Sequence, residues 1–413
     1  MTASIEPLSD CATWYSGGTP KTSVDEYWGG PIPWITSGSL TQFRLRDSER
    51  RLTELGLNNG SRLVPAGSTL FVVRGMSLNS EFRVGIAQRD LAFGQDCKAL
   101  VAREGILPEY LAYSVAGRSR EVLSMVDQAA HGTGRLPTDL IGSLGIRVVS
   151  LEEQEQVVGI LSAFDDLIEN NRRRIEILEE MARLLYREWF VHFRFPGHED
   201  VEMVDSELGP IPGGWEVVAL SDVSEVNPES VRKGDALGEI LYLDISSVGP
   251  RTVDEPEAMP FSEAPGRARR RVAHGDVIWS TVRPNRRSHV MIQHPPANLI
   301  CSTGFAVLRG TSVPPSFVLE LTSTESFVGH LESLATGAAY PAVRPPDFEA
   351  YRFALPNDTL VEEWDSQVAA MNKLVSNLRQ QNRILREARD LLIPRLVSGE
   401  LDVSDLNLDE VLA

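Results

Sequence analysis

The chain repeats itself, and this internal repeat limits its possible folds more than any other feature. Residues 163–170 (AFDDLIEN) align with residues 370–377 (AMNKLVSN), 207 positions later. The same separation relates six further pairs: Arg172 and Arg379, Ile177 and Ile384, Leu178 and Leu385, Glu180 and Glu387, Leu184 and Leu391, and Leu185 and Leu392. Self-similarity over half of a chain indicates two copies of one structural unit. The 413 residues are therefore expected to form two similar halves.

Each copy has the same order of parts. It begins with segments rich in glycine, proline and β-forming residues, such as 67–73 and 276–282, which predict strands bounded by turns. A long segment with helical periodicity follows in both copies. The expected fold is α+β, with two similar β-rich domains separated by two long antiparallel coiled-coil helices. The predicted parts are a first head (1–150), a central helix (151–195), a linker (196–207), a second head (208–357), a C-terminal helix (358–397) and an acidic tail (398–413).

Apolar residues recur every seven positions in both helical segments, which is typical of a coiled-coil seam. The first seam contains Leu161, Ile168, Ile175, Ala182 and Trp189, with Phe164, Asn171, Leu178 and Leu185 between them. The second contains Val368, Val375, Asn382, Arg389 and Leu396, with Met371, Leu378, Leu385 and Leu392. Two such seams in one chain favour an intramolecular pair. The alternative is that each helix simply packs on its own head. The second helix runs into Pro394 and Gly399 follows closely, so the helix is expected to stop there, at about residue 397.

Charge and targeting signals limit the class of protein. The net charge of −18 is unfavourable for a protein that binds nucleic acid. Basic residues nevertheless crowd one stretch that has Asp276 as its only acid, namely Arg267, Arg269, Arg270, Arg271, Arg283, Arg286 and Arg287. No secretory signal and no apolar run of about 18 residues is visible, and the three cysteines are widely spaced. These features predict a cytoplasmic protein without a membrane span.

Signatures of catalysis are missing from the sequence. Residues 17–22 (GGTPKT) resemble a phosphate-binding loop only superficially, because the second glycine before the lysine is absent. Residues 344–348 (RPPDF) are not an adenine-methyltransferase motif, and no histidine pair has helical metal-ligand spacing. The paired acids Asp165 and Asp166 are expected on a solvated helix face. The chain is therefore predicted to have no catalytic residue, no metal ligand and no cofactor of its own.

Several segments resemble the DNA-specificity subunits of type I restriction–modification enzymes. Residues 206–223 (SELGPIPGGWEVVALSDV) look like the opening of their target-recognition domains, and residues 187–193 (REWFVHF) look like the exit from their central helix. Residues 391–401 (LLIPRLVSGEL) resemble the ending of their C-terminal helix. Within the first head, residues 16–21 (SGGTPK), 27–30 (YWGG) and 32–37 (IPWITS) resemble the start of a recognition domain.

The resemblance covers essentially the whole chain and implies a function. Two recognition domains would each read one half of an asymmetric, bipartite site on double-stranded DNA, and the helices would set the spacer. Two methyltransferase (modification) subunits would dock on the helices, bind S-adenosylmethionine and methylate adenine. Restriction/translocase subunits, which use ATP and Mg²⁺, would also be able to join. One departure is that the first head begins almost at once with LSD (8–10), without the opening motif that precedes LSD (220–222).

Base reading needs side chains that donate or accept hydrogen bonds at groove edges. The candidates for DNA contact are Thr19, Lys21, Thr36, Ser37, Arg74 and Arg135 in the first head, and Ser280, Arg283, Asn285, Arg286 and Arg287 in the second. Residues 283–287 follow an apolar strand, so they are expected on a strand-end loop. For each of these residues the alternative is an ordinary solvated surface position. For the whole chain the alternatives are a stand-alone DNA-binding regulator and a coiled-coil adaptor.

Overall fold

The chain forms two compact units, and each contains one head and parts of both long helices. The computed structural model describes residues 3–128, 132–232, 235 and 237–403. The first unit comprises residues 1–170 and 381–413, and the second comprises residues 171–380. The division therefore falls inside the two helices and not between a head and its helix. The limits predicted above for heads and helices stay predictions.

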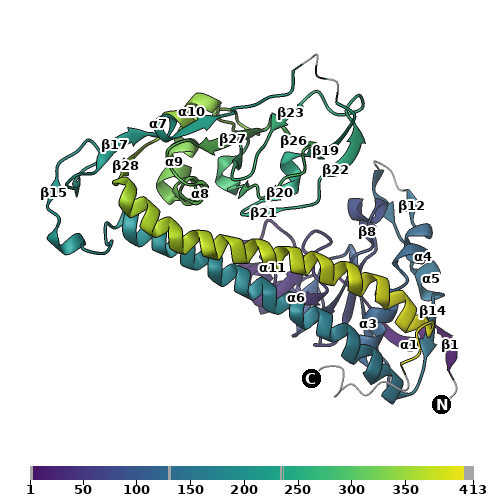
Figure 1. The fold of residues 1–413 in the computed structure, drawn as a ribbon. Coiled ribbons are helices and arrows are strands. Elements are labelled where there is room, and N and C mark those ends of the chain that lie inside the picture. Colours follow the sequence, from purple (N-terminus) through teal and green to yellow (C-terminus); the bar gives the residue numbers. More distant parts are fainter. Residues whose placement is uncertain (1–2, 129–131, 233–234, 236, 404–413) are drawn as a thin grey trace. The chain divides into compact units, whose positions relative to one another are not determined.

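The first unit, of which Figure 1 labels the short helices α3, α4 and α5, contains two main sheets. The larger has the order β2-β11-β7-β9-β4, and the smaller has the order β5-β3-β10-β6. Short ladders add β1 to β14 and β12 to β13 to β8. The strand bounds are β1 Ser4–Pro7, β2 Ala12–Ser16, β3 Trp28–Ile35, β4 Arg44–Leu45, β5 Arg51–Leu52, β6 Leu63–Val64, β7 Thr69–Val72, β8 Arg74–Gly75, β9 Val84–Ala87, β10 Leu91–Phe93, β11 Cys97–Ala102, β12 Asp127–Gln128, β13 Gly134–Arg135 and β14 Gly145–Val148. The helices are α1 Leu8–Cys11, α2 Glu54–Asn58, α3 Pro108–Ala116, α4 Ser119–Ser124 and α5 Thr138–Gly142.

The second unit repeats this topology. Its sheets have the orders β18-β27-β24-β25 and β22-β19-β26-β23, and β17 pairs with β28. The match extends to direction, because β3 runs parallel to β10 just as β19 runs parallel to β26. The strands are β15 Met203–Val204, β16 Ile211–Pro212, β17 Glu216–Ala219, β18 Ser224–Val226, β19 Glu239–Leu243, β20 Val248–Gly249, β21 Thr252–Val253, β22 Glu257–Pro260, β23 Ala268–Arg271, β24 Val277–Ser280, β25 His289–Met291, β26 Leu299–Ser302, β27 Phe305–Gly310 and β28 Arg352–Leu355. The short helices are α7 Leu220–Val223, α8 Pro315–Thr322, α9 Glu325–Leu334 and α10 Pro345–Glu349.

The two long helices are α6 (Leu151–Tyr186), which a π-helical turn at Arg187–Val191 extends, and α11 (Asp358–Ser398). Every seam position named above is buried or half-buried, as the heptad pattern predicts. In the first unit, Leu161 near the start of α6 shares a core with Leu396 near the end of α11. In the second unit, Ala182 near the end of α6 shares a core with Val368 near the start of α11. The predicted α+β fold with two packed antiparallel helices is confirmed.

Pro394 does not itself end the second helix. Helix α11 contains Pro394 and ends at Ser398. A proline inside a helix loses one backbone hydrogen bond and crowds the preceding turn. Here the buried side chains of Ile393, Leu396 and Val397 bind the last turn to the core of the first unit. The helix ends where Gly399 takes a left-handed conformation with φ of 79°.

The expectation that Asp165 and Asp166 lie on a solvated helix face is wrong for Asp165, which is only 5% exposed. The Tyr113 hydroxyl donates to Asp165 Oδ2 at 2.5 Å, and Arg389 Nη1 donates to Asp165 Oδ1 at 2.5 Å. Burial raises the pKa of Tyr113, and the Asp165 carboxylate raises it further. Asp165 therefore links a head helix, α6 and α11 within the first unit. Asp166 pairs with Arg44 of the same unit.

The second unit has its own buried ionic link. Arg251 donates to both Glu320 oxygens, with N···O distances of 2.9 and 2.5 Å, and the Glu320 side chain is fully buried. Arg379 of α11 donates to the Arg251 carbonyl and to Glu179 of α6, both at 2.6 Å. Burial opposes the charge of Arg251, but the carboxylates of Glu320 and Glu179 together with that of Glu180 outweigh it, so the pKa of Arg251 is raised. This network joins the second head to both helix segments of its unit.

Candidate nucleic-acid interface

In the second head, two loops lie together beyond the end of β24. One is the strand-end loop 281–288, and the other is the loop 335–344 that precedes α10. The Val343 amide donates to the Thr281 carbonyl at 2.9 Å, and the Arg283 amide donates to the Pro341 carbonyl at 2.7 Å. The second loop needs glycine at 337, where φ is 112° and a Cβ would meet the Tyr340 carbonyl oxygen at 3.0 Å. The main chain therefore fixes the two loops against each other.

The strand-end loop has a strained backbone. Arg283 and Arg287 take left-handed conformations with φ of 52° and 53°, and they bracket a single 3-10 turn at Pro284–Arg286. Such conformations are uncommon for residues other than glycine, and they cluster at functional sites. The loop continues from a buried strand, so its base is rigid while its tip faces solvent.

Three candidate residues of this loop present polar side chains at the surface. Asn285 and Arg286 are exposed. Arg283 is half-buried, and its guanidinium lies 4.4 Å from the ring centre of Tyr340 while Nη2 donates to the Ala339 carbonyl at 3.0 Å. Tyr340 itself is 68% exposed. The two loops therefore bring together a guanidinium, an amide and an aromatic ring.

The other two candidates of the second head are engaged elsewhere. The Nη1 and Nη2 atoms of Arg287 both donate to the carboxylate of Glu325, and this contact lowers the pKa of Glu325. Ser280 is 5% exposed, and its hydroxyl donates to the Val282 carbonyl at 3.0 Å. Both side chains shape the loop and its support, and they are poorly placed to reach a ligand.

The first head joins the equivalent loops. The Leu136 amide donates to the Val73 carbonyl at 2.9 Å, as Val343 does to Thr281 in the second head. Strand β8 then pairs with β13, which sets Arg74 directly opposite Arg135. Both arginines are exposed, and they border a cavity of about 320 Å³. The structure thus brings together two candidate residues that lie 61 positions apart in the sequence.

The remaining candidates of the first head divide into two groups. Ser37 is half-buried and adjoins the Arg74 loop, since a Cβ at Gly75 would lie 3.7 Å from the Ser37 Cβ. Thr36 forms a turn in which its amide donates to Ser39 Oγ at 2.8 Å. Thr19 and Lys21 are exposed on a different loop, which the indoles of two tryptophans hold through the carbonyls of Gly18 and Lys21.

Sequence reasoning missed three surface residues. Met76 is 76% exposed next to the Arg74 loop, and Tyr340 is the aromatic partner of Arg283. Arg50 lies 3.9 Å from the ring centre of Trp28 in the first head. Periodicity carries no signal for such residues because they stand outside regular α-helices and strands.

Two of the four arginines in the segment 267–271 form ion pairs within their own head. Arg267 pairs with Asp244 at 2.7 Å, and Arg271 pairs with Asp235 at 3.3 Å. Arg269 lies over the ring of Phe261 at 5.2 Å. Local ion pairs therefore use much of the positive charge that made this segment conspicuous in the sequence.

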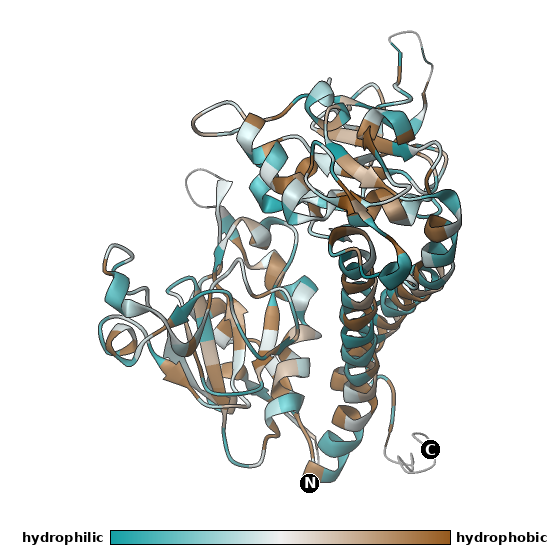
Figure 2. Ribbon diagram, turned by 90° about the vertical axis from the view of Figure 1, so that its left-hand side faces the viewer, coloured by the Kyte–Doolittle hydropathy of each residue, from teal (hydrophilic) through white to brown (hydrophobic). Residues whose placement is uncertain are grey.

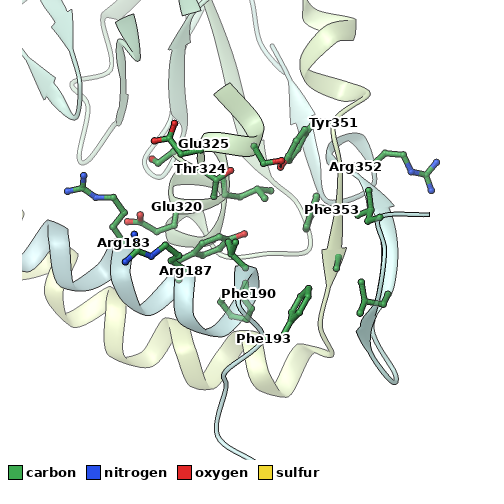
Figure 3. A pocket seen from close by; sticks show the side chains of 18 of the residues that line it. Arg183, Arg187, Phe190, Phe193, Glu320, Thr324, Glu325, Tyr351, Arg352 and Phe353 are labelled. Atoms are coloured by element: carbon green, nitrogen blue, oxygen red, sulfur yellow. The ribbon is translucent and has the colours of Figure 1, made fainter. Parts of the chain in front are cut away.

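A pocket of about 470 Å³ lies where α6 ends in the second unit. Figure 3 shows Phe190 and Phe193 on its helical side, with Thr324 and Glu325 across from them, while Arg352 extends away. The exposed side chains of Leu184, Val191 and Leu208 form part of the pocket's wall. The pocket therefore presents an apolar surface to the solvent.

Comparison with known proteins agrees with this arrangement of two similar heads. The model of the type I restriction modification DNA specificity domain family matches residues 5–180. The MjaIX specificity subunit of Methanocaldococcus jannaschii is 24% identical over 410 residues, which cover 97% of this chain and 94% of the relative. The chain belongs to the DNA specificity subunits of type I restriction–modification systems. The family resemblance inferred from the sequence is confirmed.

Two further comparisons concern the sequence and the fold of this specificity subunit, respectively. The EcoR124I/EcoR124II specificity subunit of Escherichia coli is 30% identical over 200 residues, about half of each chain. The crystal structure of the S subunit from M. genitalium has the same fold, with a TM-score of 0.51, 12% identity and coverage of 96% of both chains. Specificity subunits are non-catalytic parts of the enzyme, so this chain is a non-catalytic subunit. No helix in the described ranges is both long and apolar enough to cross a membrane.

Proposed function

We propose that each head of this specificity subunit reads one half of a bipartite DNA site through its pair of joined loops. The observation that carries the proposal is the same interloop hydrogen bond in both heads, next to which each head presents arginine side chains. Arginine recognises guanine edges, and asparagine recognises adenine edges. Arg74 and Arg135 would serve the first head, and Arg283, Asn285 and Arg286 the second.

The two loop pairs carry different side chains, so the two half-sites should differ. Thr19, Lys21, Thr36 and Ser37 would add phosphate or base contacts in the first head. Phosphate contacts position a protein on DNA, whereas base contacts specify the sequence. The recognised site should therefore be asymmetric, with a spacer whose sequence is not read.

The helices would set the length of this spacer. Helix α6 has 36 residues and α11 has 41, which correspond to about 54 and 62 Å at 1.5 Å per residue. Reading heads on successive turns of DNA need a separation of roughly 34–36 Å. The helices are thus long enough to act as the ruler of the site.

The outer faces of the helices would dock two copies of one partner. Apolar side chains remain exposed at Leu167 and Ile177 of α6, and also at Leu374 and Ile384 of α11, each 207 positions later. Apolar residues alternate with polar ones along both helices in Figure 2. An interface repeated at the period of the chain suits two identical subunits.

We infer that these partners are the DNA methyltransferase subunits of the complex. They would bind S-adenosylmethionine and methylate adenine, and the apolar surface at the end of α6 would extend one of the two docking sites. Restriction/translocase subunits would bring the sites for ATP and Mg²⁺. The complex would act in the cytoplasm, where its DNA substrate lies, and would supply much of the positive charge that this acidic subunit lacks.

A head exchange tests the reading mode. Replacing residues 208–357 with the matching part of a relative should change one half-site and leave the other half and the spacer unchanged. Mapping methylated adenines in cells that carry the exchanged subunit gives the result directly. A change in both half-sites would contradict separate reading by two heads.

Two substitutions that introduce a charge test the docking faces. Ile177→Glu and Ile384→Glu place a carboxylate in the exposed apolar stripe of α6 and of α11, respectively. Each single variant should bind one methyltransferase subunit instead of two, and the double variant should bind none, as measured by native mass spectrometry. Glu176→Gln, at an exposed polar position of α6 outside the pocket, is the matched control. Full binding of two subunits by the double variant would place the docking surface elsewhere.

A further inference from the structure

We propose that Arg283 and Tyr340 form one preassembled unit that reads a guanine in the second half-site. The inference rests on the proposed function and deepens it, because it names the base that is read and a residue that positions the reader. Tyr340 lies outside the set of contact residues that the sequence suggested. Its phenol ring is 68% exposed, so it contributes little to the core of the head.

Both loops hold Arg283 before any DNA arrives. Its backbone is fixed in a left-handed conformation, and its amide donates to the Pro341 carbonyl at 2.7 Å. Its guanidinium lies over the Tyr340 ring at 4.4 Å, and Nη2 donates to the Ala339 carbonyl at 3.0 Å. An arginine held at both ends loses less side-chain freedom on binding than a free surface arginine.

The stacked geometry favours a base edge over a phosphate. Stacking occupies one face of the guanidinium and leaves further N–H donors in its plane. A planar fork of donors matches the O6 and N7 acceptors that guanine presents in the major groove. The exposed ring beside it offers an apolar face to the neighbouring base, which a phosphate contact would not require.

The neighbouring arginines provide a contrast. Arg287 is bound by Glu325, and Arg286 is exposed on the same loop without the Tyr340 stack. In the first head, the shared hydrogen bond places Gly75 at the position of Arg283, since Gly75 lies two residues after Val73 and Arg283 lies two residues after Thr281. The stacked reader is therefore a property of the second head, and its guanine should lie in one half-site alone.

The experiment uses the assembled complex with its methyltransferase subunits and duplexes that carry 7-deazaguanine at one position at a time. This analogue lacks the N7 acceptor. One substitution in the second half-site should weaken binding about 10-fold, as expected for loss of part of a bidentate contact. Arg283→Ala should weaken binding to the natural site by at least as much, and the same 7-deazaguanine should then cause no further loss.

Variants of the ring separate positioning from simple contact. Tyr340→Phe keeps the stack and should retain the 10-fold discrimination, whereas Tyr340→Ala should lose most of it while thermal stability stays unchanged. Arg283→Lys keeps the charge but not the fork, so it should bind with little discrimination at that guanine. Arg286→Ala removes a neighbouring arginine that lacks the stack; whatever its effect on overall binding, the 7-deazaguanine effect at the guanine read by Arg283 should stay complete.

The outcomes distinguish this inference from the proposed function. A second half-site without guanine, or a 7-deazaguanine effect that persists in Arg283→Ala, would overturn the inference. So would equal weakening on all sequences with a shallower salt dependence, which marks a phosphate contact and leaves the proposed DNA interface intact. If Arg283→Ala instead impaired subunit assembly and left DNA discrimination unchanged, the loop would face a partner, and the proposed interface would fail as well.

Discussion

Replacing Glu320 with glutamine should destabilise the second unit, because the buried positive charge of Arg251 then lacks its countercharge. The side chain of Glu320 is fully buried, and that of Arg251 is 10% exposed. Glutamine keeps the size of the side chain and one acceptor for Arg251, but it removes the countercharge. Arg379 donates to the backbone carbonyl of Arg251 and does not depend on this carboxylate.

The size of the effect follows from the burial of both partners. Removing one member of a buried ion pair costs about 3–5 kcal/mol, because the remaining charge is desolvated without compensation. The isosteric amide retains part of the hydrogen bonding, so we expect about 3 kcal/mol for Glu320→Gln. Replacing both partners, as in Arg251→Met with Glu320→Leu, should cost much less, since neither charge of this pair remains buried.

Hydrogen exchange measured by mass spectrometry resolves the change by unit. Amides of the second unit should lose protection in Glu320→Gln, while amides of residues 3–128 in the first unit serve as the internal control. The double replacement should restore most of the lost protection. If the single and double variants were equally destabilised, packing and not charge compensation would govern this site.

Three further changes have expected effects on stability. Burial lowers the pKa of His289 from 6.5 to about 4, so the second unit should lose stability as pH falls from 6.5 toward 4, at up to about 1.4 kcal/mol per pH unit. His289→Phe should flatten this dependence in denaturant titrations at several pH values. Asp165→Asn leaves Arg389 without its buried countercharge and should destabilise the first unit by about 3 kcal/mol in a denaturant titration. Asp166→Asn, at the exposed neighbour, should cost under about 1 kcal/mol in the same titration. Pro394→Ala restores a backbone donor to α11 and should raise the stability of the first unit by about 1–2 kcal/mol, and an unchanged melting temperature would contradict this reasoning.

The repeat and the heptads could predict the fold because they are periodic along the chain. The offset between Ile177 and Ile384 defines equivalent positions, and seven-residue spacing defines which side of each helix is buried. Both signals can be read along the chain and tolerate many substitutions. The similarity of the two heads and the packing of the two helices followed from them without knowledge of any tertiary contact.

Residues whose roles depend on distant partners could not be assigned in this way. Asp165 resembles any surface acid of a helix until Tyr113 and Arg389 bury it. Pro394 resembles a helix end until its neighbours are packed into a core. In both cases tertiary contacts outweigh the local preference that the sequence displays.

The candidate interface was predictable only in part, for the same reason. A strand-end loop could be inferred from the apolar strand before Arg283, and the structure has a loop there. The pairing of this loop with residues 335–344 is a long-range contact, so neither the stack on Tyr340 nor the diversion of Arg287 to Glu325 could be foreseen. Charge density alone was misleading at residues 267–271, where nearby acids neutralise two of the four arginines.

The division inside the two helices also affects how the chain is made. The core of the first unit includes Leu8 and Leu70 near the start of the chain together with Leu396 and Val403 near its end. A ribosome therefore synthesises the whole second unit before it adds residues 381–413, which complete the core of the first unit. Domains usually complete folding in the order of their synthesis. Here the first unit is the first to be synthesised but the last to complete its core. Until then, only chaperones or its own partial collapse can shield its apolar surface from aggregation.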